Sequence, residues 1–196
     1  RKFVKNVSKT ARLSKADLTT LMVEEFPELE GDIGRIYAGM DGEAKAVSRG
    51  IYEHYLPVSA GDPVPSSETG AITGLCDRID TLCGNLGVGV EASGSQDPFG
   101  LRRTGKGLLR IIMEKNLDID LDILIRENIA LYRKQGIKLD KDTARKVNDF
   151  LKVQMSQKLE EDYRYDVARS VMSSGELNPL VLNEKASAVS SIIKEK

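Results

Sequence analysis

The residue types that most often carry chemistry are sparse in this sequence. His54 is the only histidine of the chain, which excludes histidine-rich metal sites and any catalytic pair of imidazoles. It stands in the string YEHYLP, which indicates a packed or capping histidine near the end of a helix. The two cysteines, Cys76 and Cys83, are seven residues apart. On one helix their Cα atoms would lie about 10 Å apart, too far for a disulfide, so we expect free thiols in a reducing compartment.

Two carboxylates, Asp77 and Asp80, fall on one side of an otherwise apolar helical stretch. A carboxylate on a core-facing stripe is costly unless it is paired. Two interpretations stay open: an internal ion pair with Arg78 or another arginine, or the remnant of a metal-binding or phosphate-binding site. The glycine-rich run at residues 84–94 lacks the GxxxxGK[ST] pattern of a phosphate loop and follows a helix. It therefore favours a turn between packed helices.

The strongest local feature is the string DPFGLRRTGKGLLR at residues 97–110. It predicts a helix with Asp97 as its N-cap and Pro98 in its first turn. At about 100° per residue, four cations fall within one arc of roughly 100°, and we call this set the basic face: Arg102, Arg103, Lys106 and Arg110. The opposite side is aliphatic: Leu101, Leu108, Leu109 and Ile112.

Such a basic face can neutralise the phosphates of RNA without reading its sequence. The alternatives are an ordinary solvated face, or ion pairs with a nearby acidic run: Asp118, Asp120 and Asp122. Gly105 and Gly107 lower the helix propensity of this stretch, which is plausible where a backbone or a ligand must come close.

The elements that must position these residues are helical nearly everywhere. The pattern Ser14-x-x-Asp17 predicts the start of a helix that ends at Pro27, with a core stripe formed by Leu18, Leu21, Met22 and Phe26. Further helices are expected at residues 28–40, 43–55, 68–86, 97–116, 120–134 and 140–196, with a loop at 56–67 and a break near 173–179. No stretch alternates as a strand does, so the sequence predicts an all-α bundle.

Composition sets limits on function. The 196 residues carry 29 Lys and Arg against 30 Asp and Glu, a net charge of −1, so any basic patch must be local. We expect no DNA partner, and no membrane partner because no apolar run approaches the ~18 residues of a span. Nothing resembles a signal peptide. The chain begins without Met and is expected to be a piece of a longer, cytoplasmic polypeptide.

Four strings together resemble one family: residues 15–31 (KADLTTLMVEEFPELEG), 53–57 (EHYLP), 76–82 (CDRIDTL) and 94–103 (GSQDPFGLRR). They are similar to the middle region of the β subunit of bacterial glycyl-tRNA synthetase, the heterotetrameric type. The similarity spans about residues 9–121 and continues more weakly to the end of the chain. The last string is long and particular, which makes chance similarity a poor explanation.

The resemblance implies an α2β2 ligase that attaches glycine to its tRNA using ATP and Mg. In that family the α subunit holds the aminoacylation site, and the β subunit binds and positions tRNA(Gly). The resemblance also implies an HD-domain-like helical bundle, which we place at residues 1–135, followed at 136–196 by a helical connector. This chain alone is expected to be non-catalytic and to bind no cofactor.

HD phosphohydrolases bind metal through a His, a His-Asp pair and a later Asp. Asp77 is similar to that later Asp, Ala16-Asp17 aligns with the His-Asp pair, and His54 resembles an auxiliary histidine. Because Ala16 replaces the paired histidine, we expect no competent metal site and no phosphohydrolase activity. Two alternatives to tRNA binding stay open: an active HD-type phosphohydrolase that uses Asp17, His54 and Asp77, or a scaffold that docks other subunits, for example through the loop at residues 58–68.

Overall fold

The computed structural model describes residues 1–90, 97 and 99–194. In this part of the chain the structure has α-helices and two short 3-10 helices, η1 and η2, with no strand. The all-α prediction is therefore confirmed, while the HD-like assignment stays a prediction. No helix among the described residues is long and apolar enough to cross a membrane. Pro98 and the last four residues of the glycine-rich run, 91–94, lie outside the described residues.

The chain divides into two compact units, Arg1–Asp77 and Arg78–Lys196. The division falls inside the long helix α5 (Glu68–Gly87) and not at residues 135/136, where the sequence predicts a boundary. At Gly136 the chain only turns, with φ at +75°, from α7 (Leu121–Lys134) to α8 (Thr143–Asp162). These two helices pack against each other, which keeps both sides of Gly136 in one unit.

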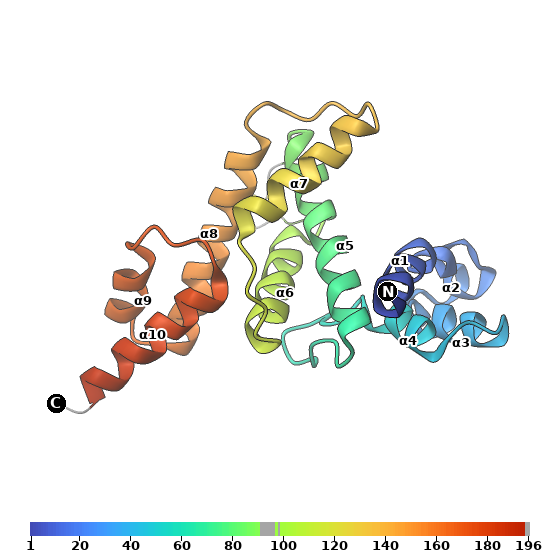
Figure 1. The fold of residues 1–196 in the computed structure, drawn as a ribbon, viewed down its shortest axis with the longest axis horizontal. Helices are drawn as coiled ribbons and strands as arrows, with labels where there is room; N and C mark the ends of the chain where they lie inside the picture. The colour runs from blue at the N-terminus through green and yellow to red at the C-terminus, as the bar shows by residue number, and fades with distance from the viewer. Residues whose placement is uncertain (91–96, 98, 195–196) are drawn as a thin grey trace. The chain divides into compact units, whose positions relative to one another are not determined.

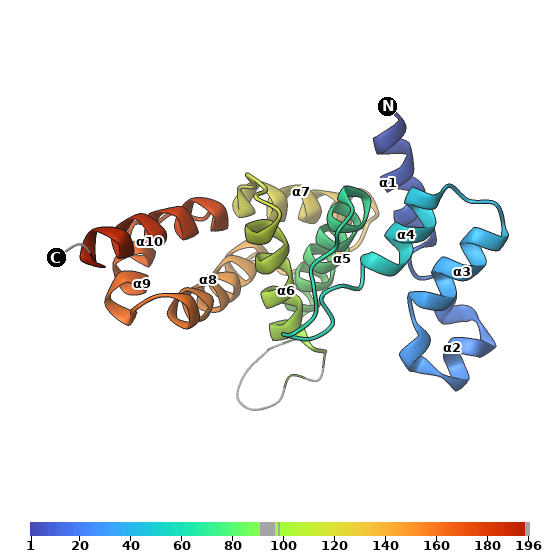
Figure 2. The same ribbon diagram turned by 90° about the horizontal axis from the view of Figure 1, so that it is seen from below.

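Before α5 begins, the first unit contains four α-helices and the two 3-10 helices. This part of the chain is drawn in shades of blue in Figures 1 and 2. In chain order they are α1 (Lys2–Leu13), η1 (Ala16–Thr19), α2 (Leu21–Glu25), η2 (Pro27–Leu29), α3 (Asp32–Met40) and α4 (Lys45–Glu53). Helix α4 packs against both α1 and α3. The core between them is small and aliphatic, as the low aromatic content predicts: Leu13, Ala38, Val47 and Ile51.

The helix predicted from Ser14 to Pro27 is wrong. Ser14 lies just after α1, and its hydroxyl donates a hydrogen bond to the carbonyl of Ala11 at 3.1 Å. Thr20 then takes an extended backbone conformation that separates η1 from α2, and its Oγ1 accepts a hydrogen bond from the Val23 N–H. Because this break rotates the two pieces, the predicted core stripe is exposed: Leu18, Leu21, Met22 and Phe26.

The next helices match the sequence more closely. Helix α3 begins at Asp32 rather than at residue 28, because Gly31 has a φ of +79° and the preceding residues form η2. Helix α4 is shorter at both ends than the predicted 43–55. Helices α5 and α7 lie within one residue of the predicted bounds, and the predicted break near 173–179 separates α9 (Tyr165–Met172) from α10 (Pro179–Lys194).

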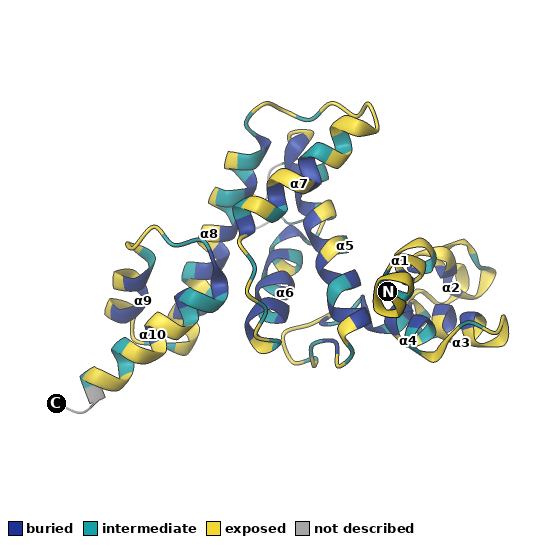
Figure 3. Ribbon diagram, viewed as in Figure 1, coloured by how far each residue is buried: buried dark blue, intermediate teal, exposed yellow. Residues whose placement is uncertain are grey.

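The second unit is built around α8, which packs against α6 (Leu101–Glu114), α7 and α9. Helix α10 lies beside α9 (Figure 1). It also contacts α6. Buried residues, drawn dark blue in Figure 3, recur along these helices, and most of them are aliphatic. The largest fully buried side chains of this unit are Ile79, Leu82, Leu101, Leu108, Leu109, Ile111, Ile112, Ile125, Leu151 and Leu159.

Candidate nucleic-acid interface

The start of α6 is fixed by the side chain of Asp97. Its two carboxylate oxygens accept hydrogen bonds from the N–H groups of Leu101 (2.7 Å) and Arg102 (2.9 Å). Gly100 precedes the helix in the left-handed conformation, with φ at +63°, which places Asp97 under the first turn. The helix therefore begins at Leu101, four residues after the predicted start at residue 97, and its N-cap is Gly100 and not Asp97 as predicted. The Asp97 carboxylate still satisfies the first backbone donors.

The aliphatic side of α6 is buried as the spacing predicts, since Leu101, Leu108, Leu109 and Ile112 are all within the core. The space beside the two glycines of this helix is filled by side chains of the protein itself. A Cβ on Gly105 would lie 2.9 Å from Cε1 of Phe150 on α8, and one on Gly107 would lie 2.9 Å from Nε of Arg78. Both glycines thus let neighbouring side chains approach the α6 backbone.

The four cations of the basic face differ in their surroundings. Arg103 is exposed, and the other three are half-buried. Lys106 forms an ion pair with Glu161 of α8, with Nζ 3.1 Å from Oε1. Arg110 pairs with Glu114 one turn later on α6, at 2.8 Å from Nε to Oε1. Carboxylates of the same unit therefore offset part of the positive charge that the sequence predicts on this face.

The acidic residues at the start of α7 form hydrogen bonds and an ion pair with groups outside the basic face. Asp120 is the N-cap of α7 and accepts hydrogen bonds from the N–H groups of Asp122 (2.8 Å) and Ile123 (3.2 Å). Asp122 pairs with Arg126 at 2.6 Å, and this bond holds the pKa of its carboxyl below the ordinary value. Asp118 accepts a hydrogen bond from the side-chain amide of Asn178 at 2.6 Å.

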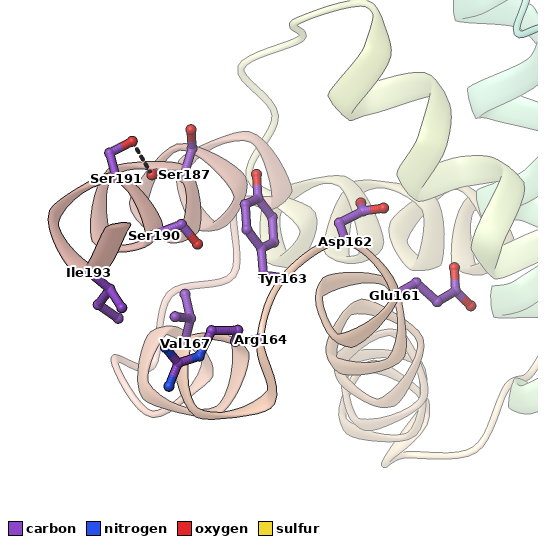
Figure 4. Close-up of a pocket in the computed structure, with 9 residues that line it drawn as sticks. All are labelled: Glu161, Asp162, Tyr163, Arg164, Val167, Ser187, Ser190, Ser191 and Ile193. Atoms are coloured by element: carbon purple, nitrogen blue, oxygen red, sulfur yellow. Dashed lines mark hydrogen bonds between the residues drawn. The ribbon is translucent and has the colours of Figure 1, made fainter. Parts of the chain in front are cut away.

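Glu161 also stands at the rim of a pocket of about 750 Å³ in the second unit (Figure 4). Asp162 at the end of α8 lines the pocket together with Tyr163 and Arg164, the two residues between α8 and α9. Helix α10 contributes hydroxyls that include Ser187. The Tyr163 hydroxyl is 3.0 Å from Oδ1 of Asn183. The pocket is lined by acidic and basic side chains. One of them, Glu161, also forms the ion pair with Lys106 of the basic face.

Asp17, one of the three residues that resemble the HD metal site, is buried and accepts a hydrogen bond from the backbone. Its Oδ2 accepts a hydrogen bond from the Gly31 N–H at 2.6 Å, and its Oδ1 lies 3.4 Å from the hydroxyl of Tyr55. Burial, with the charge of Asp17 next in importance, raises the pKa of the Tyr55 hydroxyl well above its ordinary value. Asp17 therefore ties η1 to the start of α3 and orients Tyr55.

His54 and Asp77 are likewise engaged with protein groups. His54 follows the last residue of α4, is fully buried, and places Nδ1 at 2.6 Å from the carbonyl oxygen of Ile51. Asp77 forms an ion pair with Lys15 at 2.9 Å, and this ammonium also lies over the Tyr55 ring. Sequence reasoning missed Lys15, which has the opposite charge but stands 62 positions away in the chain.

These surroundings do not suit a metal ion. The described residues contain no group of three or more His, Cys, Asp or Glu side chains that could hold one. The ammonium of Lys15 contacts the Asp77 carboxylate, where a metal cation would otherwise bind. Asp80, the other carboxylate of the pair, faces α7, where the side-chain amide of Asn128 is 3.3 Å from its Oδ1.

Comparison with known proteins gives the relationship directly. The family model described as "Glycyl-tRNA synthetase beta subunit" matches residues 1–173 of this chain. The chain belongs to that family. It is similar to "Glycine--tRNA ligase beta subunit" of Halalkalibacterium halodurans, with 38% identity over 183 residues, or 92% of this chain and 26% of the relative.

Two more members of the β-subunit family give the same picture. The β subunit from Desulfitobacterium hafniense is 43% identical over 172 residues, which is 86% of this chain and 25% of the relative. The one from Bacillus subtilis is 38% identical over 184 residues, 93% of this chain and 26% of the relative. The resemblance found in the sequence is therefore confirmed, and the chain spans about a quarter of the length of the curated relatives it matches.

Proposed function

We propose that this chain is a helical module of a glycine–tRNA ligase that binds tRNA(Gly) and helps to position it for glycylation. Catalysis belongs to the α subunit of an α2β2 ligase that uses ATP and Mg, in the cytoplasm where translation takes place. The chain itself is non-catalytic and binds no cofactor. The observation that carries this proposal is the family match over residues 1–173.

The structure supports a contact with phosphates on α6. The buried aliphatic side anchors this helix in the core of its unit, so the basic face is presented from a fixed backbone. Phosphate contacts require cations in a set position and do not require base edges, which suits a module that positions RNA. Arg103 is the most exposed of the four cations, and we expect it to contribute most.

Two cations of the basic face, Lys106 and Arg110, are already in ion pairs, so a phosphate must displace a carboxylate to contact them. Lys106 and Glu161 are both exposed by more than 40% of their side chains, and such a pair is worth at most about 1 kcal/mol. A phosphate can therefore displace Glu161 at small cost. Arg110 has only 18% of its side chain exposed, so it would act mainly by its charge rather than by direct contact.

The test is fluorescence anisotropy of labelled tRNA(Gly) with the wild-type chain and with Arg103→Glu. Because one phosphate contact is lost, we expect affinity to fall about 3- to 10-fold at low salt, and the salt slope to fall by about 1. The matched control is Lys138→Glu, which makes the same charge change at an exposed position in the loop between α7 and α8. Equal affinities for both variants would remove Arg103 from the interface.

A further inference from the structure

We propose that a row of cations on α1 forms a second phosphate-binding surface, through which the first compact unit contacts tRNA. We call it the α1 cation row; its members are Lys2, Lys5, Lys9 and Arg12. Its ligand is the sugar–phosphate backbone of RNA, so the row would hold tRNA without reading its bases. The choice of tRNA rests on the proposed function, whereas the row itself rests on the sequence and the structure.

The four cations share one exposed side of α1. At about 100° per residue they fall within an arc of roughly 80°, and all four are exposed. A different side of the helix, which carries the fully buried Thr10, packs against α4. Figure 3 shows α1 largely in the colour of exposed residues. The row extends about 15 Å along the helix axis and can therefore face several successive phosphates of one strand.

The backbone that carries the row is held in place by close packing. A Cβ on Gly50 of α4 would lie 2.9 Å from Cγ2 of Thr10, so α1 approaches α4 closely at this point. Lys9 also pairs with Glu43, two residues before α4 begins, at 2.7 Å from Nζ to Oε1. The row therefore has a fixed position on its unit, which contacts with phosphates in a set register require.

Few carboxylates compete for the cations of this row. No Asp or Glu precedes Asp17 in the chain. Within the part of the chain that the structure describes, Lys9 is the one member of the row that forms an ion pair. On the basic face of α6, by contrast, two of the four cations are paired. RNA can therefore contact three cations of the α1 row without displacing a carboxylate.

The chemistry of the row favours RNA over a covering polypeptide. Lys and Arg are almost never fully buried unless they are paired. Any protein segment laid over the row, from the same polypeptide or from another, would have to supply a carboxylate for each unpaired cation. A second copy of the chain would bring like charges together. Interfaces with nucleic acids are wet and rich in positive charge, so the cations keep water while they contact phosphates.

The test measures tRNA(Gly) binding by the complete ligase, because its β subunit includes whatever else packs near α1. Lys5→Gln with Arg12→Gln removes two phosphate contacts. The Kd from fluorescence anisotropy at about 50 mM salt should then rise about tenfold, and the salt slope should fall by about 2. A non-cognate tRNA should lose the same factor, because phosphate contacts do not depend on sequence. In aminoacylation the KM for tRNA should rise while kcat changes little.

Two control variants separate charge from structure. Lys5→Arg with Arg12→Lys keeps both charges and should recover most of the lost affinity. Lys138→Gln with Lys141→Gln removes two exposed cations from the loop between α7 and α8 and should leave the Kd unchanged. Thermal unfolding of each variant reports whether it is folded.

Three results would overturn the proposal. One is an equal Kd for the wild type and the Lys5/Arg12 Gln variant in the complete ligase, as expected if another part of the protein covers the row. The others are an equal loss in the Lys138/Lys141 variant and no recovery in the charge-preserving variant. The Arg103 variant is read separately. If it weakens binding and the Gln variant of the row does not, phosphate binding at α6 stands and this proposal alone fails.

Discussion

At the scale of single residues, the net charge of the basic face depends on which carboxylates pair with its four cations. The sequence places four cations on one side of α6, and the buried aliphatic residues opposite them confirm that spacing. It gives no sign that Glu161, 55 positions from Lys106, supplies a carboxylate to this face. Spacing along a helix predicts neighbours on that helix, whereas partners from another helix depend on packing that the periodic pattern does not encode.

Glu161 gives a prediction about RNA affinity. Glu161→Gln removes the carboxylate that competes with phosphate for Lys106, and an exposed pair is worth up to about 1 kcal/mol, so tRNA affinity should rise about two- to fivefold. Glu160→Gln is the control, because its carboxylate accepts a hydrogen bond from Ser156 on the same helix. Anisotropy at low salt measures both, and an equal change in the two variants would contradict the role given to Glu161.

Glu53 gives a prediction about pH. Burial alone would raise its pKa, but hydrogen bonds from Ser66, Ser67 and Arg49 outweigh it and lower the pKa of Glu53 to about 2. A lowered folded-state pKa means that this stabilisation is present above pH 4.5 and is lost as pH falls from 4.5 toward 2.

The measurement is the free energy of unfolding against pH for wild type and Glu53→Gln. At 1.36 kcal/mol per pKa unit, the wild type should lose at most about 3 kcal/mol more than the variant over that interval. Denaturant unfolding at several pH values gives both curves. Parallel curves would show that the Glu53 carboxylate does not hold the 66–67 segment as described.

At the scale of elements, long periodic helices are well predicted and short pieces are not. Helices α5 and α7 have many apolar positions in register, so their bounds follow from the sequence within a residue. The stretch from Ser14 to Pro27 has a helical pattern too, yet the extended residue Thr20 and the bond from Asp17 to Gly31 divide it. A side chain that binds a backbone group 14 residues away overrides local propensity.

Close contact between α4 and α5 gives a prediction about packing. A Cβ on Gly70 would lie 2.5 Å from the Cβ of Glu53, so Gly70→Ala should destabilise the protein by about 1–3 kcal/mol despite its better helix propensity. Gly39→Ala in α3 meets nothing within 4 Å and should stabilise by about 0.5 kcal/mol. Thermal unfolding compares them; a gain in both would mean that the two helices do not approach this closely.

At the scale of the whole molecule, the chain divides into two compact units. The sequence predicts a composition change near residue 136, but the units divide within α5, between Asp77 and Arg78. A continuous helix with an unbroken apolar stripe gives no sequence signal of such a division. The HD-like domain and its connector, at 1–135 and 136–196, therefore stay a prediction that the compact units do not reproduce.

The division into two compact units predicts that a local defect in one unit changes the stability of that unit alone. A Cβ on Gly34 would lie 2.7 Å from Cγ2 of Ile51 and 2.9 Å from Oδ2 of Asp17, so Gly34→Ala should loosen the first unit. Hydrogen exchange should then speed up in α1, α3 and α4 and stay unchanged in α6, α7 and α8, because a local defect is confined to its cooperative unit. A uniform increase over all helices would mean that the chain unfolds as one unit.

We propose that this member of the β-subunit family binds tRNA through contacts with its phosphates. The measurement that tests it most directly is the affinity of the wild-type chain for tRNA(Gly) at about 50 and 200 mM salt, with a non-cognate tRNA alongside. We predict binding to both RNAs that weakens steeply as salt rises. Absence of binding to tRNA(Gly) at the lower salt concentration, or binding that is insensitive to salt, would contradict tRNA binding through phosphates.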